Sequence, residues 1–145
     1  MATKIETINS AYSKMRISGL TVQPTPEDLM LAVYRLEDMM EEFYGRTLDV
    51  GYFFEDDPQP NTQTGVERKH DNMMSSNLAT RLCVDFGKAV PILLMNEASS
   101  TYSSSSALVA RDRRNAGASP SRAPRGAGNR SLQRWTPLST ASAVP

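Results

Sequence analysis

The last third of the chain contains a strongly basic segment that cannot form a hydrophobic core by itself. Residues 111–145 include seven arginines and a single acidic residue, Asp112, among Gly, Pro, Ala and Ser. Such a segment buries too little apolar surface to offset the entropy that is lost on ordering it. We therefore expect an extended basic arm over residues 115–145, which requires a partner, and a helical domain over residues 1–114.

An excess of acidic residues lies nearer the N-terminus. Residues 27–57 contain ten acidic and two basic residues, whereas the whole chain of 145 residues has a formal net charge of zero. Opposite charges on two separate regions favour attraction between copies of one chain. The sequence therefore predicts self-association or stacking on other subunits.

Cysteine content and hydropathy exclude several classes of protein. Cys83 is the only cysteine, so the chain can build neither a disulfide framework nor a cysteine-based zinc site, and we expect it to be a small core residue. No apolar run approaches the length of about 18 residues that a membrane helix needs, and no signal peptide is recognisable. We expect a soluble protein made in the cytoplasm, with no cofactor and no metal.

Two helices are predicted in the first 45 residues. Thr3–Glu6 fits a capping box, and apolar residues at helical spacing follow until Gly19. Thr25–Asp28 supplies a threonine cap, a proline and two acids for a second helix that ends at Gly45. A short connection predicts that the two helices pair antiparallel.

Two further helices are predicted over about residues 66–86 and from Pro91 to about Arg111. The fourth contains Ser99–Ser106, a run with poor helix propensity. Small side chains allow close packing between helices, but the run is equally consistent with a frayed or broken helix.

The segment between the second and third helices has a different pattern. Residues 47–54 are short and aromatic, which suits an extended segment or a single strand. The segment should either pack over the helix pair or pair with a neighbouring subunit, and we expect Tyr52, Phe53 and Phe54 to be its contacts with a subunit or a tail protein. Residues 55–65 form a polar loop that should project into solvent or over a neighbour. The predicted fold is therefore mainly α: about four bundled helices, a short extended aromatic segment and a non-globular arm.

Several segments together resemble one known family. They are Leu36–Tyr44, Gly51–Asp57, Asn77–Arg81, Ser119–Asn129 and Trp135. In the same order they look like the packaged-DNA stabilisation protein of short-tailed phages, also called the tail accessory factor, portal adaptor or head-completion protein. The resemblance covers roughly residues 25–135.

This resemblance implies a structural virion protein at the head-to-tail junction. Members of the family assemble as a ring of twelve copies beneath the portal, close the DNA-filled head and carry the distal tail proteins. The implied partners are the portal protein, other copies of the chain, a tail hub or nozzle protein, and a tailspike or tail fibre. DNA would pass through the channel without specific binding, and no enzymatic activity is implied.

The resemblance also assigns a partner to the basic arm, because the family inserts its C-terminal arm between portal subunits. Trp135 suits an interface anchor, since a tryptophan combines a large apolar area with an N–H donor. The expected portal-binding residues are Arg122, Arg125, Arg130, Leu132, Arg134, Trp135 and Leu138. Arginine suits carboxylates and DNA phosphates equally, so a nucleic-acid-binding protein with a basic arm is the alternative.

Four acids of the second helix, Glu37, Asp38, Glu41 and Glu42, allow three interpretations. The simplest is a solvated acidic face of the helix. In a ring, the same acids could line the channel and let DNA slide without sticking. Paired carboxylates also carry out glycoside hydrolysis, so a cell-wall hydrolase is a third alternative. His70, the only histidine, is expected on a helix surface.

Overall fold

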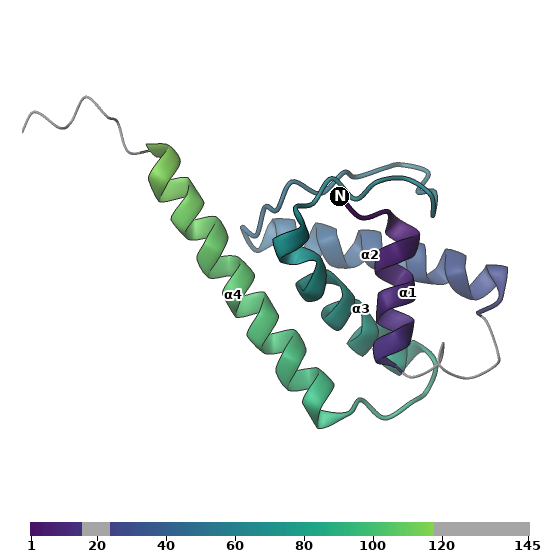
Figure 1. Cartoon of the computed structure of the whole chain (residues 1–145). Coiled ribbons are helices and arrows are strands. Elements are labelled where there is room, and N and C mark those ends of the chain that lie inside the picture. Colours follow the sequence, from purple (N-terminus) through teal and green to yellow (C-terminus); the bar gives the residue numbers. More distant parts are fainter. Residues whose placement is uncertain (16–23, 118–145) are drawn as a thin grey trace, which may run out of the picture. The chain divides into compact units, whose positions relative to one another are not determined.

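A computed structural model of the chain describes residues 1–15 and 24–117 (Figure 1). Four α-helices and one short 3-10 helix are present in these ranges, and no strand is. The helices are α1 (Lys4–Lys14), α2 (Pro26–Gly45), α3 (Asp71–Asp85) and α4 (Ile92–Gly117), with the 3-10 helix η1 (Arg68–His70) before α3. The prediction of a mainly helical fold is therefore confirmed.

Both predicted helix caps are present. The Thr3 hydroxyl accepts from the backbone N–H of Glu6 at 3.3 Å, and the Glu6 carboxylate accepts from the N–H of Thr3 at 2.8 Å. Thr25 and Asp28 make the same reciprocal pair before α2, where Pro26 fills the first helical position. Each box satisfies N–H groups that have no partner within the helix.

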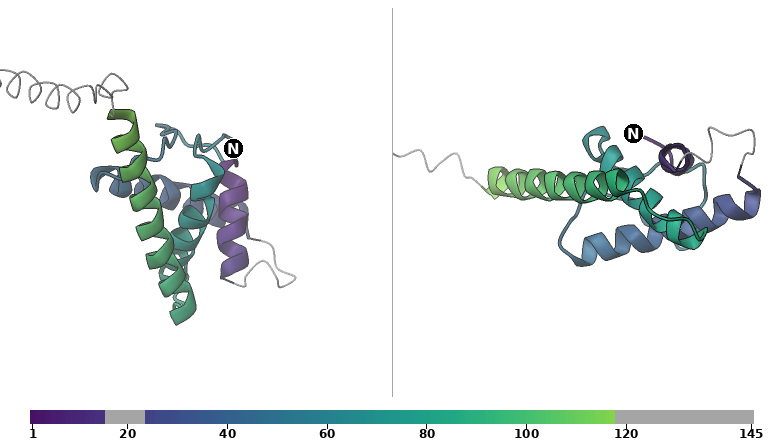
Figure 2. Two further views of the ribbon diagram at one scale, coloured as in Figure 1. Left: turned by 60° about the vertical axis from the view of Figure 1, so that its left-hand side comes forward. Right: turned by 90° about the horizontal axis from the view of Figure 1, so that it is seen from below.

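The core lies between α1, α2 and α3. Ile8, Leu36 and Leu78 come from these three helices, and each is fully buried. In both views α1 crosses α2 steeply, so the predicted antiparallel pairing of these two helices is wrong (Figures 1 and 2). One reason is that α1 packs against α3 as well as α2. In addition, the connection between α1 and α2, residues 15–25, is longer than the loop of a tight helical hairpin.

α3 and α4 run antiparallel to each other. The Asn77 side chain donates to the Ala98 carbonyl oxygen at 3.1 Å, and further along the pair His70 lies 3.0 Å from Ser105. α3 begins at Asp71, later than the predicted residue 66, although Val66 is fully buried as expected. Cys83 is also buried, which confirms its prediction as a core residue.

The serine-rich run lies inside a continuous helix, so the alternative of a frayed or broken α4 is wrong. Hydroxyls of this run bond to the preceding turn: Thr101 donates to the Glu97 carbonyl at 2.7 Å and Ser103 to that of Ser99 at 3.0 Å. Ser105 is buried, which fits the alternative of close packing at that position. Small hydroxyl side chains thus meet their hydrogen-bonding needs within the helix itself.

The segment from residue 47 to 67 contains no strand and runs in extended form past α2 and the start of α1 (Figure 1). Its polar loop, residues 55–65, was expected to project into solvent or over a neighbour. Asp56, Asp57, Gln59, Asn61 and Gln63 are exposed, but the loop also contacts the start of α1, which was not predicted. The carbonyl oxygens of Thr62 and Pro60 accept from the N–H groups of Lys4 and Ile5, at 2.9 and 2.8 Å. These are among the first N–H groups of α1, which need acceptors from outside the helix.

The chain divides into two compact units, Met1–Ala110 and Arg111–Pro145. The described part of the second unit, residues 111–117, is the last part of α4. Arg111, Arg113 and Arg114 are exposed on it.

Candidate assembly surfaces

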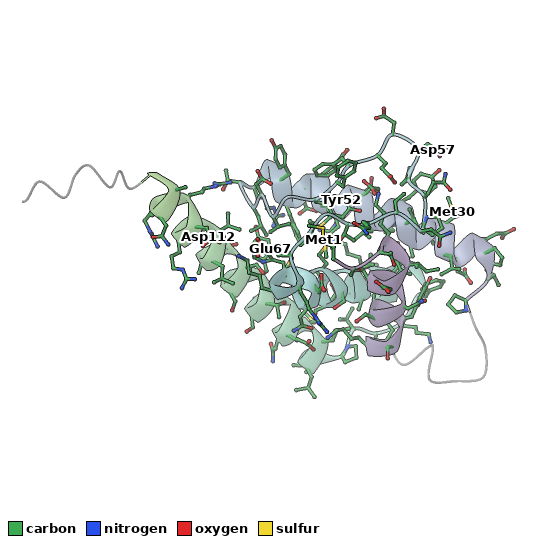
Figure 3. The ribbon with its side chains drawn as sticks, turned by 45° about the horizontal axis from the view of Figure 1, so that its top comes forward. Met1, Met30, Tyr52, Asp57, Glu67 and Asp112 are labelled. Carbon is green, nitrogen blue, oxygen red and sulfur yellow. The ribbon has the colours of Figure 1, made fainter. Side chains whose placement is uncertain are left out.

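A buried lysine joins three parts of the chain. The Lys4 side chain is fully buried, and its ammonium donates to Glu37 of α2 and, at 2.8 Å, to Glu55 of the loop. The Tyr52 hydroxyl donates to the same Glu37 oxygen at 2.8 Å, and the ammonium lies 5.4 Å from the centre of the Tyr52 ring. Figure 3 shows Tyr52 beside α2. The cluster therefore holds the aromatic segment against α1 and α2.

The surroundings shift the pKa values of two members of this cluster, Tyr52 and Glu55. Burial, reinforced by the neighbouring Glu37 and Glu55 carboxylates, raises the pKa of the Tyr52 hydroxyl. The hydrogen bond from Lys4 lowers the pKa of Glu55. At neutral pH Tyr52 is thus a neutral donor and Glu55 a charged acceptor.

The four acids of α2 lie in different environments. Glu37 is buried against Lys4 and Tyr52, which contradicts both a solvated face and a channel lining at this position. Asp38 and Glu41 are exposed, and Glu42 is half-buried. Glu42 accepts from Arg81 at 2.5 Å, and this bond lowers the pKa of the carboxyl group. Channel lining by these three stays a prediction.

An aromatic pocket lies beside the C-terminal end of α2. It has a volume of about 540 Å³ and is lined by Glu41, Tyr44, Gly45, Asp49, Tyr52 and Phe54. The Phe54 ring meets Tyr44 and Tyr52 edge to face, with ring centres 5.9 and 5.1 Å apart. Aromatic residues held in this way offer ring faces and edges to a ligand without further ordering.

The three aromatic residues predicted to contact a subunit or tail protein differ in exposure. Phe53 is 66% exposed and Phe54 is 39% exposed, whereas Tyr52 is buried. Tyr44 of α2, which packs against Phe54, is 58% exposed. The contact role of Tyr52, Phe53 and Phe54 stays a prediction.

A second exposed surface, which is apolar, was not predicted from the sequence. Large apolar side chains are exposed on both sides of the turn between α3 and α4, at Val84, Ile92, Leu93 and Met95. Ile92 and Leu93 are 75% and 83% exposed. The signal was the unbroken run from Ile92 to Met95, because a helix with one buried stripe cannot bury four successive residues.

This surface adjoins a polar junction of three helices. Lys14 of α1 donates to Asn72 of α3 at 2.9 Å and to Glu97 of α4 at 2.5 Å. The Lys14 bond lowers the pKa of Glu97, which also accepts from Ser76 at 3.0 Å. A pocket of about 400 Å³ lies next to this junction and is lined by Lys14, Met15, Pro91, Leu93, Leu94 and Glu97.

His70 is not on a helix surface, so that prediction is wrong. It is 3% exposed, and its Nδ1 atom lies 3.0 Å from the Ser105 hydroxyl. His70 is the last residue of the 3-10 helix η1 and precedes the first residue of α3, where its side chain is covered by contact with α4. The histidine therefore helps to join η1, at the start of α3, to α4.

The predicted portal-binding residues, from Arg122 to Leu138, lie outside the described residues. Within residues 1–15 and 24–117, no group of three His, Cys, Asp or Glu side chains could hold a metal ion. No helix in the same ranges is long and apolar enough to cross a membrane.

Exposed apolar and aromatic surfaces on a small helical chain are typical of a protein that binds other proteins. The family model of the P22 tail accessory factor matches residues 1–138, and the chain belongs to this family. The predicted resemblance is thereby confirmed, and it makes the chain a structural component of the phage tail, which is not a class of enzyme. No curated protein matches the chain.

Proposed function

We propose that the chain is a subunit of the head-to-tail connector, which assembles as a ring under the portal after DNA packaging. In this role it closes the DNA-filled head and provides the platform for the distal tail proteins. Membership of the tail accessory family supports a virion role. The basic arm supports attachment to a partner, because residues 118–145 contain four arginines, no acidic residue and a single tryptophan.

The observation that carries the proposal is the apolar surface at the turn between α3 and α4. Val84, Ile92 and Leu93 are each more than two-thirds exposed, and Met95 is 54% exposed. An isolated chain gains nothing from such exposure, whereas a subunit interface removes these side chains from water. We assign this surface to contact between neighbouring subunits of the ring.

Assembly then depends on the portal. One small surface binds weakly between free monomers, but a portal that holds several arms raises the effective concentration of neighbouring subunits. The protein is therefore a monomer in solution and forms a ring only on the portal.

Sedimentation velocity tests this proposal directly. Three samples are compared: the purified chain alone, the chain with purified portal of the same phage, and the chain with an unrelated protein that matches the portal in size and charge. We expect a monomer in the first and third samples and a complex with several copies in the second. A chain that remains monomeric with portal, or that forms rings without it, contradicts the proposal.

DNA binding is measured in the same preparation. Steep salt-dependent binding of duplex DNA by the free chain, without binding to portal, would favour the predicted alternative of a nucleic-acid-binding protein.

A further inference from the structure

The aromatic pocket at the end of α2 combines two chemical features, an aromatic wall and a pair of exposed carboxylates. Tyr44, Tyr52 and Phe54 form its apolar wall, and Glu41 and Asp49 contribute carboxylates. Both acids are exposed, and neither is paired with a basic side chain in the part of the chain that the structure describes. Asp49 accepts from the backbone N–H of Gly51 at 3.0 Å, which fixes the orientation of its carboxylate.

The position of the pocket adds a third feature. Tyr44 and Gly45 are the last residues of α2, where the helix dipole is negative and favours a cation. Two basic residues lie close by, and both pair with acids that do not line the pocket. Arg46, next to Gly45 in the sequence, pairs with Glu42. The Lys4 ammonium, 5.4 Å from the centre of the Tyr52 ring, pairs with Glu37 and Glu55. Among the described residues, the two carboxylates of the pocket, Glu41 and Asp49, are therefore left without an ion-pair partner.

These features define the ligand as a guanidinium group. A guanidinium is planar, so it stacks on an aromatic ring while the N–H groups at its edge donate to carboxylates. A lysine ammonium matches the charge but has no planar face. The volume of about 540 Å³ is large enough for a whole arginine side chain.

The chain itself carries the matching group. Residues 118–145 contain arginine as their only charged residue type, at four positions, with no lysine and no acid. We infer that the aromatic pocket of one copy binds an arginine of the basic arm of a second copy. This inference rests on the proposed ring.

A ring requires such a pair of different surfaces. In a cyclic assembly each subunit uses one surface toward the copy ahead and another toward the copy behind. The pocket and the arm are two surfaces of this kind, with complementary charge. The arm thus links neighbouring copies through its arginines in addition to reaching the portal.

Photo-crosslinking with isotope-labelled chains tests the inference. A photoreactive phenylalanine is introduced at Gly45, which lines the pocket and has no atom within 4 Å of the position of an added Cβ. Chains with this residue carry ¹⁵N, and an equal amount of unlabelled wild-type chain is added with portal. After irradiation, mass spectrometry identifies the crosslinked peptides. We expect crosslinks between a labelled pocket peptide and an unlabelled arm peptide.

Matched charge variants separate pocket binding from general attraction. Glu41→Gln with Asp49→Asn removes both carboxylates of the pocket, and we expect a several-fold lower yield of mixed-isotope crosslinks. Glu27→Gln with Asp56→Asn removes the same charge from exposed acids that do not line the pocket, and the yield should not change. Replacing the four arm arginines by lysine keeps the charge but should lower the yield, because the planar stacking is lost.

The outcomes distinguish the inference from the connector function. If labelled pocket peptides are crosslinked to labelled arm peptides alone, the pocket binds the arm of its own copy, and the inference is overturned. A ring that forms on portal without mixed-isotope arm crosslinks, or with a yield equal in both charge variants, also overturns it and leaves the connector function intact. Wild-type chains that form neither a ring nor mixed crosslinks contradict both.

Discussion

The ammonium of Lys4 is buried against the carboxylate of Glu37, and the Lys4 side chain has no exposed surface. A charge in this position is tolerated because the two residues are opposite in sign and because Glu55 and Tyr52 complete the hydrogen bonds around them. The start of α1 is thereby tied to the middle of α2 and to the aromatic segment.

Lys4→Met should destabilise the protein, since it leaves the Glu37 carboxylate buried without its cation. Breaking one side of a buried ion pair costs about 3 kcal/mol or more in the free energy of unfolding. Lys4→Met combined with Glu37→Leu removes both charges and should recover much of this loss. Urea titration followed by circular dichroism measures all three chains. A loss below about 1 kcal/mol for Lys4→Met would contradict a tightly coupled pair.

Stability should fall in acid. The pKa values of Glu42, Glu55 and Glu97 all lie below their ordinary value of 4.5, because Arg81, Lys4 and Lys14 donate hydrogen bonds to them. A group whose pKa is lowered by folding stabilises the native state above its ordinary pKa, and this contribution is lost as pH falls through the folded-state pKa.

The unfolding free energy, measured from about pH 6 to about pH 3, should therefore decrease below the ordinary carboxyl pKa. Glu55→Gln removes one of the three titrating groups and should make the decrease shallower. An acid dependence identical to that of the wild-type chain would show that the bond from Lys4 to Glu55 contributes no pH-dependent stability.

Gly65→Ala should destabilise the extended segment. Gly65 has a φ of +76°, and an added Cβ would lie 2.8 Å from the backbone oxygen of Gly51. Both the conformational strain and the contact with rigid backbone oppose the substitution, so we expect a loss of about 1 kcal/mol or more. Gly45→Ala is the matched control. Gly45 is the last residue of α2, and a Cβ added there would lie in open space, so this substitution should be neutral or slightly stabilising. Equal midpoints in thermal unfolding would contradict this difference.

Two neighbouring leucines of α4 should behave in opposite ways. Leu93 is 83% exposed, so Leu93→Ala should change the free energy of unfolding by about 0.5 kcal/mol or less but weaken ring assembly on the portal. Leu94 is 6% exposed, so Leu94→Ala should cost about 2 kcal/mol or more in stability. Thermal unfolding and sedimentation with portal separate the two effects. If Leu93→Ala assembles normally on the portal, the exposed apolar surface around Leu93 is not part of the subunit interface.

Local signals predicted the helices well, and contacts between distant residues account for the errors. Thr3 and Thr25 lie three residues from the acids that complete their capping boxes, so both helix starts were readable from the sequence. Glu37, in contrast, has its partner 33 residues away at Lys4, and nothing near Glu37 in the sequence distinguishes it from an exposed acid.

The same reasoning applies to the loop and to His70. The carbonyl groups of Pro60 and Thr62 bind the first N–H groups of α1, a contact between backbone atoms that leaves no mark on side-chain composition. His70 faces Ser105, 35 residues further along. The order of short similar segments over roughly residues 25–135 identified the family, because that signal does not depend on how the segments pack, and the family model over residues 1–138 confirms it.

Trp135→Ala tests the arm as the portal anchor. A tryptophan in a binding segment contributes a large apolar area and an N–H donor, and truncation of such a residue commonly costs about 2 kcal/mol in binding. We therefore expect at least about a tenfold weaker attachment to isolated portal, with no change in thermal unfolding, since residue 135 lies beyond the helical unit Met1–Ala110 that contains the core. Leu138→Ala, in the same segment, should weaken attachment less because the side chain is smaller. If Trp135→Ala attaches to the portal with wild-type affinity, Trp135 does not contribute to the portal contact. If its thermal unfolding midpoint is lower than that of the wild-type chain, Trp135 packs on its own chain instead.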